Sequence, residues 1–358
     1  MKKTAIYYDS LLSIGGAERM VLSLAEKLNA DVITSGFNPD LLNTFNTKVN
    51  VINIGNFSIK YSIKLGTLIE QPLRFYFCSL GNRYDINLFV GYTSIFAAKK
   101  GLHNIWYCMS PNRALYDLKE YKLQQTGKVS RLLLNLYANI FTPLDQHWVK
   151  NKFSKIISQT KTVQKRVKKY YGLSSKVIYS PVNTDKYSFS KFGDFYLAVS
   201  RLTPEKRMDL IADAFITMHD KKLVLVGDGP MKNKIKQTIK NHKNIKLYSS
   251  ISDKKLSELY SNCLASIYMP MEEDYGMVPI EGMASGKGCI AVNEGGCRET
   301  VINGRTGFLI APTVEDISKV VNSYDKKLAK SFKKDCLAQS EKFSTDQSIM
   351  KWRKEITT

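Results

Sequence analysis

Short apolar segments of strand length alternate with helix-forming segments along this chain, and the alternation limits the possible folds more than any other feature. The chain opens with a strand-like run at 4–10, then a glycine loop, then 17–28, where apolar residues recur at helical spacing. Strands that alternate with helices favour a parallel sheet covered by helices on both faces. The other strands expected in this half are 30–36, 48–55, 85–91 and 104–110, and the other expected helices include 62–80 and 128–141.

The alternation restarts after a loop-like stretch at 179–195, which is rich in Ser, Asn, Asp and Gly and contains Pro181. Five strand–helix units follow, of which the last ends with a helix at 297–304. The sequence therefore predicts an α/β protein with two doubly wound, Rossmann-like domains, residues 1–180 and 181–344, that face each other across a cleft. Ligands of such sheets bind beyond the carboxyl ends of the strands, which is where the motifs described below lie.

A formal net charge of +21 is the strongest bulk property, with lysines dense over 150–172. This excess suits nucleic acid, an anionic membrane surface or small anionic substrates, and charge alone does not choose among them. No RRM, KH or zinc-finger pattern supports nucleic acid. The six cysteines form no CxxC pair and the four histidines no HExxH, so neither zinc nor disulfides are predicted.

No apolar run approaches the roughly 18 residues of a membrane-spanning helix, and the start MKKTAIYYDS lacks the apolar segment of a secretory signal. We therefore expect a cytoplasmic protein. The basic, aromatic-rich region 119–171 could also rest on an anionic membrane, which would make the protein peripheral on the inner face. The alternative for the apolar run 131–141 is an ordinary core helix.

Two carboxylates, Glu273 and Glu281, lie on either side of an expected helix start near Gly276. Pro279 fits the first turn of that helix, and Met277 and Glu281 then share one face. The free N–H groups of the first turn form a site suited to a diphosphate, and the carboxylates could accept hydrogen bonds from hydroxyls on either side of it. The alternative is that acidic residues here only favour the helix N-terminus.

Arg201 and Lys206 lie between a strand and a helix in SRLTPEKRMD, where a guanidinium and an ammonium can bind phosphates and neutralise a leaving diphosphate. Among so many basic residues, a purely structural role is the alternative. Gly227 follows a strand and Gly16 opens the first helix, so each can bring backbone close to a ligand or form a plain turn. The chain has no G-x-G-x-x-G, no GK[ST] and no D-x-D, so neither a dinucleotide motif, a P-loop nor an aspartate-held metal is predicted.

Five segments in order resemble the GT-B fold, retaining glycosyltransferase family 4 (glycosyl transferases group 1), and in particular its mannosyltransferase-like members. They are GGAER, SRLTPEKRMDLIADAF, LVLVGDGP, SDKKLSELY and EEDYGMVPIEGMASGKGCIAVNEGGCRETVINGRTGFLI. The resemblance runs from about residue 4 to residue 312 and is strongest over 197–311, where the spacing of the two glutamates is the family's mark. It implies a GT-B fold whose C-terminal helix, 345–358, packs back on the first domain.

The resemblance also implies a site for a nucleotide-sugar donor, without a metal or other cofactor. Arg201 and Lys206 would bind the diphosphate, Glu273 the sugar hydroxyls and Glu281 the ribose, while the loop 249–252 would lie near the base. Glu273, Arg201 and Lys206 carry the expected catalytic roles. The full expected donor set is Gly16, Arg201, Lys206, Gly227, Ser250, Ile251, Glu273, Gly276, Met277, Val278 and Glu281.

One residue departs from the family pattern. In WYCMSPNRALYDL, Met109 stands where a histidine normally contacts the sugar, and a thioether cannot donate a hydrogen bond. Arg113 and Asp117 match the rest of the segment, and all three residues are expected on the acceptor side of the cleft.

The favoured hypothesis is transfer of a hexose, mannose from GDP-mannose, with retention of configuration onto a growing glycan or a lipid-linked saccharide. Donors linked to UDP are one alternative. A nucleotide-binding scaffold that has lost turnover is another, motivated by Met109. No nucleic-acid partner is expected, and the oligomeric state is left open.

Overall fold

The computed structural model describes residues 2–13, 15–55, 69–124 and 127–357, in two compact units. Unit 1 comprises Met1–Pro181 and Ser348–Thr358, and unit 2 comprises Val182–Gln347. The chain therefore leaves unit 1 after Pro181, next to the expected boundary between 180 and 181. It returns to unit 1 within the expected C-terminal helix.

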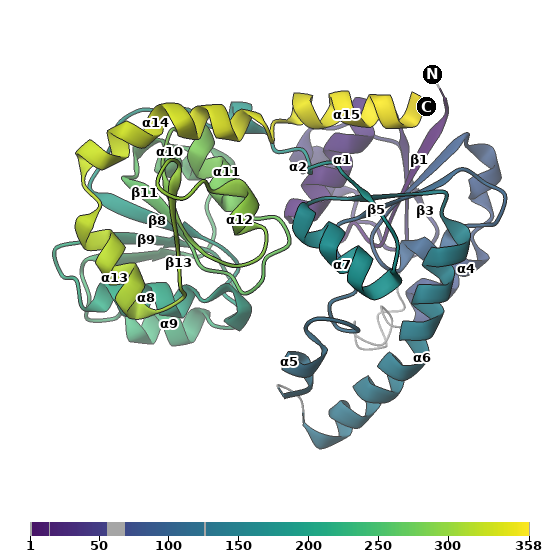
Figure 1. The fold of residues 1–358 in the computed structure, drawn as a ribbon, viewed down its shortest axis with the longest axis horizontal. Coiled ribbons are helices and arrows are strands. Elements are labelled where there is room, and N and C mark those ends of the chain that lie inside the picture. Colours follow the sequence, from purple (N-terminus) through teal and green to yellow (C-terminus); the bar gives the residue numbers. More distant parts are fainter. Residues whose placement is uncertain (1, 14, 56–68, 125–126, 358) are drawn as a thin grey trace. The chain divides into compact units, whose positions relative to one another are not determined.

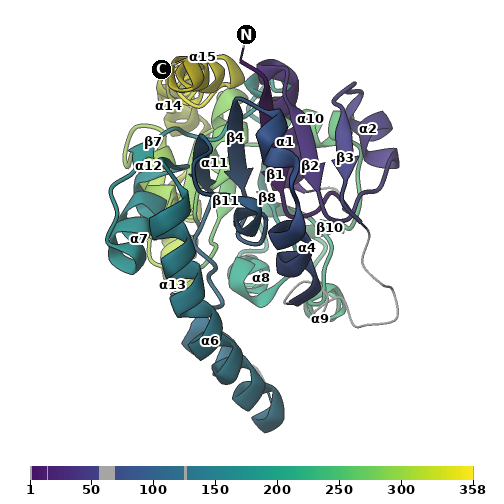
Figure 2. The same cartoon turned by 90° about the vertical axis from the view of Figure 1, so that its right-hand side faces the viewer.

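Unit 1 contains a parallel sheet with helices on both faces, as Figures 1 and 2 show. Its described strands follow the order β3-β2-β1-β4-β5-β6-β7. The strands are β1 (Thr4–Tyr8), β2 (Asp31–Thr34), β3 (Val51–Asn53), β4 (Ile86–Val90), β5 (Asn104–Cys108), β6 (Lys155–Ser158) and β7 (Lys176–Val177). The helices are α1 (Gly16–Leu28), α2 (Asp40–Phe45), α4 (Gln71–Phe77), α5 (Lys119–Gln124), α6 (Lys128–Lys152) and α7 (Lys161–Tyr171), with 3-10 turns η2 (Leu80–Arg83) and η3 (Ser94–Ala97).

The two faces of this sheet carry separate apolar clusters because successive side chains of a strand point to opposite faces. Ile6 and Tyr8 of β1 belong to the cluster that α1 covers. Ala5 and Tyr7 belong to the cluster on the other face, which includes side chains from α4, α6 and α7. Both faces are therefore buried, as the nearly continuous apolar composition of the strands requires.

The last helix, α15 (Thr345–Thr357), contributes to the core of unit 1. Ile349 and Trp352 are buried in the same cluster as α1, and the Trp352 ring meets Tyr107 edge-on with 4.8 Å between centroids. Glu355 forms ion pairs with Lys155 of β6 and with Lys176 of β7. The C-terminal segment is thus an integral part of unit 1.

Unit 2 contains a second parallel sheet, whose described strands follow the order β10-β9-β8-β11-β12-β13. The strands are β8 (Phe195–Val199), β9 (Lys222–Val226), β10 (Ile245–Tyr248), β11 (Ala265–Tyr268), β12 (Cys289–Val292) and β13 (Gly307–Ile310). The helices are α8 (Met208–Ile216), α9 (Lys232–Thr238), α10 (Asp253–Asn262), α11 (Met277–Ala284), α12 (Cys297–Thr300), α13 (Val314–Ser323) and α14 (Lys326–Glu341), with η4 (Thr184–Lys186) and η5 (Pro204–Lys206).

Several elements differ from the sequence-based expectation. The strands β6, β7 and β13 were not predicted: β6 lies inside a lysine-rich segment, β7 has only two residues, and β13 follows the helix expected at 297–304. The helix expected at 128–141 continues to Lys152 through Pro143. The helix expected at 297–304 is the short α12, which gives way to β13. Of the helix expected at 62–80, α4 lies within the described part and 62–68 lie outside it.

Candidate functional site

The strand order of unit 2 reverses between β8 and β11, which are neighbours in the sheet although three helices and two strands separate them in sequence. Such a switch point is where open α/β sheets bind ligands, beyond the carboxyl ends of the strands. Arg201 lies two residues after β8, and its side chain is exposed. Lys206 ends the turn η5, and Glu273 follows β11. The fold therefore brings three of the predicted site residues to one end of two adjacent strands.

Glu273 and Lys206 contact each other directly in an ion pair between Oε2 and Nζ. The Tyr268 hydroxyl, at the end of β11, donates to the same carboxylate at 2.9 Å. Burial and the nearby Glu273 charge raise the pKa of Tyr268 well above its usual value, so the phenol remains a donor. The Glu273 side chain is consequently positioned by one cation and one phenol.

The backbone of Glu273 is fixed by a glycine pair that the sequence analysis did not single out. Gly296 donates its N–H to the Glu273 carbonyl at 2.6 Å. Gly295 has φ +48°, and a Cβ there would lie 2.8 Å from the Glu273 nitrogen and closer still to its carbonyl oxygen. Only a residue without a side chain allows this approach. The glycine pair in NEGG was the available sequence signal.

The same segment is tied to the strand end of β12 through Glu294. The Glu272 N–H donates to Glu294 Oε2 at 3.0 Å, and Arg207 pairs with Glu294 Oε1 at 3.0 Å. Glu272 and Arg207 both have a left-handed backbone, with φ +45° and +49°. Strained residues of this kind persist where surrounding contacts fix them, and they concentrate at functional sites.

Helix α11 begins at Met277, after Gly276 in a left-handed conformation with φ +81°. The N-cap residue is a glycine and offers no side chain as a cap, and the first-turn N–H groups of Met277 and Val278 have no acceptor within the helix. Glu281 lies one turn later on the face of Met277 and accepts a hydrogen bond from the buried Tyr260 hydroxyl at 2.9 Å. The expected helix start is therefore present, and Glu281 is oriented by a tyrosine from α10.

Gly227, at the end of β9, brings its backbone close to another part of the chain and not to an open ligand site. Its φ is +158°, and a Cβ would lie 3.0 Å from the Ser200 carbonyl carbon and closer to its oxygen. The N–H groups of Ser200 and Leu202 donate to the carbonyls of Val226 and Asp228 at 3.0 and 2.9 Å. The glycine thus lets the ends of β8 and β9 join, which sets the path of the chain toward Arg201.

Ser250 and Ile251 lie between β10 and α10. Ser250 is exposed, Ile251 packs against the apolar cluster that contains Leu197, and Ser252 caps α10 by accepting from the Lys255 N–H at 3.2 Å. Because β10, β9, β8 and β11 are consecutive in the sheet, the residues predicted to contact base, diphosphate and sugar follow one another along its carboxyl edge.

The switch point of unit 1 lies between β1 and β4 and carries an aspartate that the sequence analysis did not single out. Asp9 follows β1 and accepts from the backbone N–H groups of Tyr92, Thr93 and Ser94 at 3.1, 3.0 and 2.8 Å. Gly16 lies nearby in sequence as the first residue of α1, after the extended Gly15.

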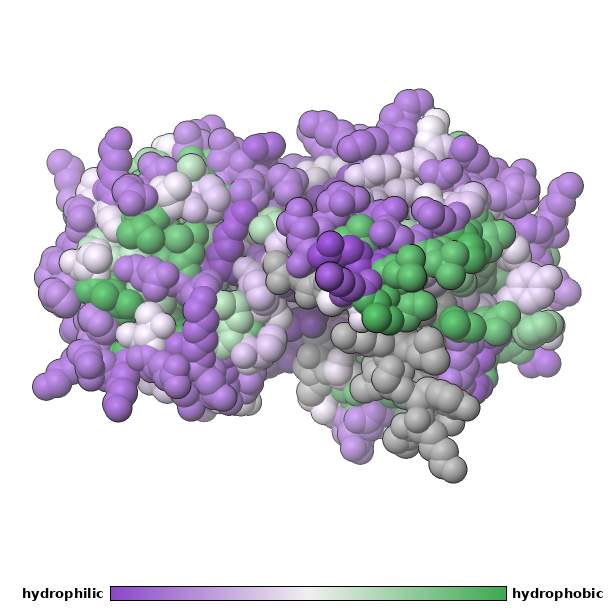
Figure 3. Space-filling model, turned by 90° about the horizontal axis from the view of Figure 1, so that it is seen from below, coloured by the Kyte–Doolittle hydropathy of each residue, from purple (hydrophilic) through white to green (hydrophobic). Residues whose placement is uncertain are grey.

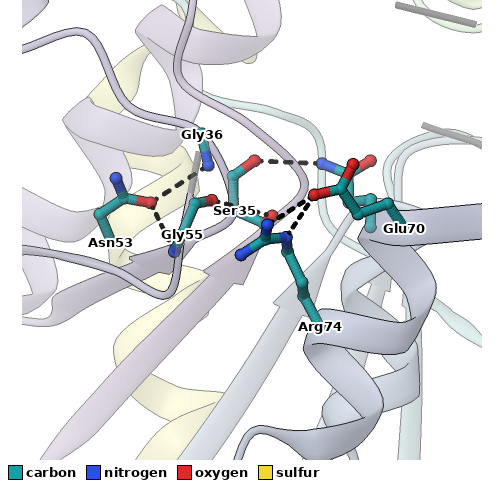
Figure 4. A network of polar contacts seen from close by, with 7 residues as sticks. Ser35, Gly36, Asn53, Gly55, Glu70 and Arg74 are labelled. Carbon is teal, nitrogen blue, oxygen red and sulfur yellow. Dashed lines mark hydrogen bonds and ion pairs between the residues drawn. The ribbon is translucent and has the colours of Figure 1, made fainter. Parts of the chain in front are cut away.

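A second polar network fixes the ends of β2 and β3 beside α4 (Figure 4). Asn53 Oδ1 accepts from the N–H groups of Gly36 and Gly55 at 3.2 and 3.1 Å. Arg74 pairs with Glu70 across one helical turn. The carboxyl edge of the unit 1 sheet is therefore held by side chains and not only by its strands.

The residues expected on the acceptor side separate into two environments. Met109 is partly buried against the α1-side cluster, and its carbonyl accepts from the Gln159 amide. Arg113 and Asp117 form an ion pair at 2.8 Å, and Arg166 also reaches Asp117 at 3.4 Å. The structure brings Arg113 and Asp117 together with each other, and Met109 lies in a different, apolar environment.

Within the described residues, no three His, Cys, Asp or Glu side chains are grouped as ligands for a metal ion. All six cysteines are buried thiols. In the described part of the chain, none of the helices has the length and apolar character needed to cross a membrane.

Two parallel Rossmann-like sheets, each with polar residues at its switch point, define the GT-B class of glycosyltransferase folds. Solved structures agree with this class. Alr3699/HepE of Anabaena, in complex with UDP and glucose, gives a TM-score of 0.77 with 18% identity over 100% of both chains. Sucrose-phosphate synthase of Thermosynechococcus elongatus gives 0.79 with 15% identity, covering 100% of this chain and 98% of that one.

Sequence comparison matches part of the chain to a known family and finds several relatives. Residues 183–335, most of unit 2, match the family Glycosyl transferases group 1. The chain is 25% identical over 374 residues to the alpha-1,3/1,6-mannosyltransferase ALG2 of Dictyostelium discoideum, with 87% of each covered. It is 30% identical over 207 residues to the uncharacterized glycosyltransferase MJ1178 of Methanocaldococcus jannaschii, covering 56% of this chain and 58% of that protein. The chain therefore contains a segment, 183–335, that is similar to this family of glycosyltransferases, and mannosyltransferases are among its relatives.

Proposed function

We propose that this enzyme transfers mannose from GDP-mannose, with retention of configuration and without a metal, onto a glycan or a lipid-linked saccharide. Two mannosyltransferases among its relatives support the donor. One is ALG2 of Dictyostelium discoideum, and the other is a GDP-Man:Man(3)GlcNAc(2)-PP-Dol alpha-1,2-mannosyltransferase of the same organism, 25% identical over 52% of this chain. The observation that carries the proposal is the Glu273–Lys206 pair, a few residues before the glycine-started N-terminus of α11.

In this proposal the diphosphate binds Lys206, Arg201 and the first-turn N–H groups of α11. Phosphate oxygens suit this set because a helix N-terminus and two cations together offset their charge. The phosphate would take over Lys206 from Glu273, which frees the carboxylate to accept hydrogen bonds from sugar hydroxyls while Tyr268 keeps it in place. Glu281, oriented by Tyr260, would accept from the ribose.

The reaction then needs no protein nucleophile. The glycosidic bond to the diphosphate breaks, and the departing negative charge is stabilised by Arg201 and Lys206. The acceptor hydroxyl attacks the same face of the sugar and passes its proton to the leaving diphosphate. Such a front-face path retains the anomeric configuration.

A thermal-shift panel tests the donor, using GDP, UDP, ADP and their common sugar conjugates in EDTA. A ligand present at about 100 times its Kd adds roughly 2.7 kcal/mol of stability, which gives a readable shift in Tm. Stabilisation by GDP and GDP-mannose alone supports the proposal. Stabilisation by uridine nucleotides instead would show that the donor is linked to UDP and not to GDP. The structure of the Anabaena neighbour contains UDP, so the panel includes this alternative. A shift by none of them would contradict the proposed site.

Arg201→Ala tests the diphosphate contact. We expect it to weaken the affinity for the stabilising nucleotide by about 1.5–3 kcal/mol, the range for lost hydrogen bonds to a charged group. Isothermal titration measures this change, and unchanged affinity would remove Arg201 from the site. Glu273→Gln should abolish sugar transfer in the same preparation. Glu272→Gln is its matched control, because Glu272 is an exposed carboxylate one residue earlier.

A further inference from the structure

Helix α6 (Lys128–Lys152) carries apolar side chains on two opposite faces. Its buried residues Ala138, Asp145 and Val149 lie on one face, which packs on the rest of unit 1. Leu136 and Ile140 each lie two residues from Ala138, an offset of about 200° around the helix axis. The side chains of Leu136 and Ile140 therefore point away from the core of unit 1.

The outer face forms a continuous exposed stripe. Apart from the adjacent Leu132 and Leu133, its members follow one another three or four residues apart, and each is between 49% and 73% exposed. They are Val129, Leu132, Leu133, Leu136, Ile140 and Leu144. The first part of the helix, 128–137, contains no buried residue and extends away from the sheet of unit 1 in Figure 2. A helix that is apolar on both sides is normally covered on both sides.

Helix α4 extends this surface. Leu73, Tyr76 and Phe77 are exposed, and Phe77 is the most exposed large apolar side chain in the described part of the chain, at 77%. Tyr76 contacts Trp148 of α6, with 5.8 Å between ring centroids. Apolar side chains gather on the surface of unit 1 in Figure 3. The α6 stripe together with these three α4 residues is called the α4–α6 surface below.

The charges around the stripe select among possible occupants. By the same helical geometry, Lys150 lies in line with Leu132 at the side of the stripe and Lys128 lies about 40° from that line, whereas Arg131 and Lys152 lie on the packed face. The only carboxylate of the helix, Asp145, is buried. In a dimer made by pairing two α6 stripes, Lys128 and Lys150 would meet their counterparts without acidic partners from the helix. An anionic lipid surface would match them, and an amphipathic helix with basic ends and an apolar face lies in such an interface.

We propose that the α4–α6 surface binds an anionic membrane, with α6 lying in the plane of the lipid headgroups and its stripe inserted among the acyl chains. This role does not depend on the donor sugar, and it places unit 1 of the enzyme at a membrane. A lipid-linked acceptor would then diffuse in two dimensions to the enzyme.

Vesicle flotation tests the proposal with the full-length protein. We expect binding to vesicles of equal parts phosphatidylcholine and phosphatidylglycerol, and little binding to phosphatidylcholine alone. The double variant Leu132→Gln, Leu136→Gln should weaken partitioning at least about tenfold, since two exposed leucines lose their apolar contribution. The matched control Leu337→Gln, Met350→Gln removes two exposed apolar side chains from α14 and α15 and should bind as the wild type does.

The contribution of the lysines and the insertion of the stripe into the bilayer are measured in separate experiments. Lys128→Gln with Lys150→Gln should lower the affinity for anionic vesicles about tenfold or more, since each basic residue near such a surface contributes roughly a factor of five. Because the native thiols are buried, a polarity-sensitive dye attached at Leu133→Cys reports insertion, and the same dye at Leu337→Cys is the control. A blue shift at the first position only supports the proposal.

Two results would overturn the proposal. The first is equal flotation of the wild type and the Leu132→Gln, Leu136→Gln variant, or no flotation of either. The second is a concentration-dependent dimer in analytical ultracentrifugation that this variant dissociates, without vesicle binding, because a second copy would then cover the stripe. Neither outcome depends on nucleotide binding, so failure here leaves the proposed donor untouched.

Discussion

The glycine pair behind Glu273 allows a sharp test of how the site is built. Gly295→Ala introduces a Cβ against backbone atoms of Glu273 and Glu272, at 2.8 and 2.9 Å from a nitrogen and a carbon. Gly304→Ala is a matched control in the same unit. Gly304 also has a positive φ, +73°, but a Cβ there would meet no described atom within 4 Å. The two substitutions share backbone strain and differ in the close approach.

The expected magnitudes follow from these two contributions. A side chain in the left-handed region costs roughly 1–2 kcal/mol, so Gly304→Ala should lower the free energy of unfolding by about that amount. At Gly295 the new Cβ also displaces the Glu273 backbone, and overpacking of this kind typically adds about 1–3 kcal/mol. We therefore expect Gly295→Ala to cost about 2–5 kcal/mol and to displace Glu273 from Tyr268 and Lys206.

The assay is urea unfolding followed by far-UV circular dichroism, with hydrogen exchange of the 264–276 backbone as the local readout. The three tryptophans, Trp106, Trp148 and Trp352, all lie in unit 1, so their fluorescence is an internal control that should not change. Equal losses of stability for the two variants would refute the reasoning, because the close approach at Gly295 would then contribute nothing. This test needs no assumption about the ligand.

Two further predictions concern unit 1. Burial raises the pKa of Asp145 to about 6 although the hydroxyls of Tyr116 and Tyr171 donate to it at 2.6 Å. A folded pKa above the unfolded one means stability that is complete below about pH 4 and is lost as pH rises through 6, by about 3 kcal/mol. Asp145→Asn should remove this slope in urea titrations between pH 4 and 7, and parallel curves for both proteins would contradict the assignment. Trp352→Ala should cost about 3–5 kcal/mol in unit 1 unfolding, whereas Met350→Ala, exposed on the same helix, should stay within about 0.5 kcal/mol. Similar losses for both would show that α15 is not part of the core.

The fold was largely predictable because most strands are apolar runs bounded by turn residues. The runs at 4–10 and 85–91 contain β1 and β4, and their parallel pairing follows from the helix-forming segments between them. Two of the strands that were missed, β6 and β7, have too few apolar residues for a pattern. In β6 only Ile156 and Ile157 are apolar, and they are buried or nearly so because β5 pairs with them. Pairing with β5 therefore stabilises β6 as a strand, although its local sequence does not predict one.

The site was predictable at the level of residue type and position, and not at the level of contacts. Glu273 and Lys206 could be placed at strand ends from sequence, and the sheet order makes those ends neighbours. The hydrogen bonds from Tyr268 and Tyr260 depend on side-chain directions set by packing across α10, α11 and β11. Asp9 escaped notice because its partners are backbone N–H groups more than eighty residues away, which no local pattern encodes.

The discontinuity of unit 1 has a consequence for how the protein is made. Unit 2 is one uninterrupted stretch, Val182–Gln347, so it is translated in full before the residues of α15 that complete unit 1. Unit 1 begins first and finishes last, because Ile349 and Trp352 fill a core whose other members were translated much earlier. Domains usually complete folding in the order of translation, and here that order is inverted for the final packing step. Until α15 is released, the nascent chain exposes the apolar face of unit 1 that α15 covers.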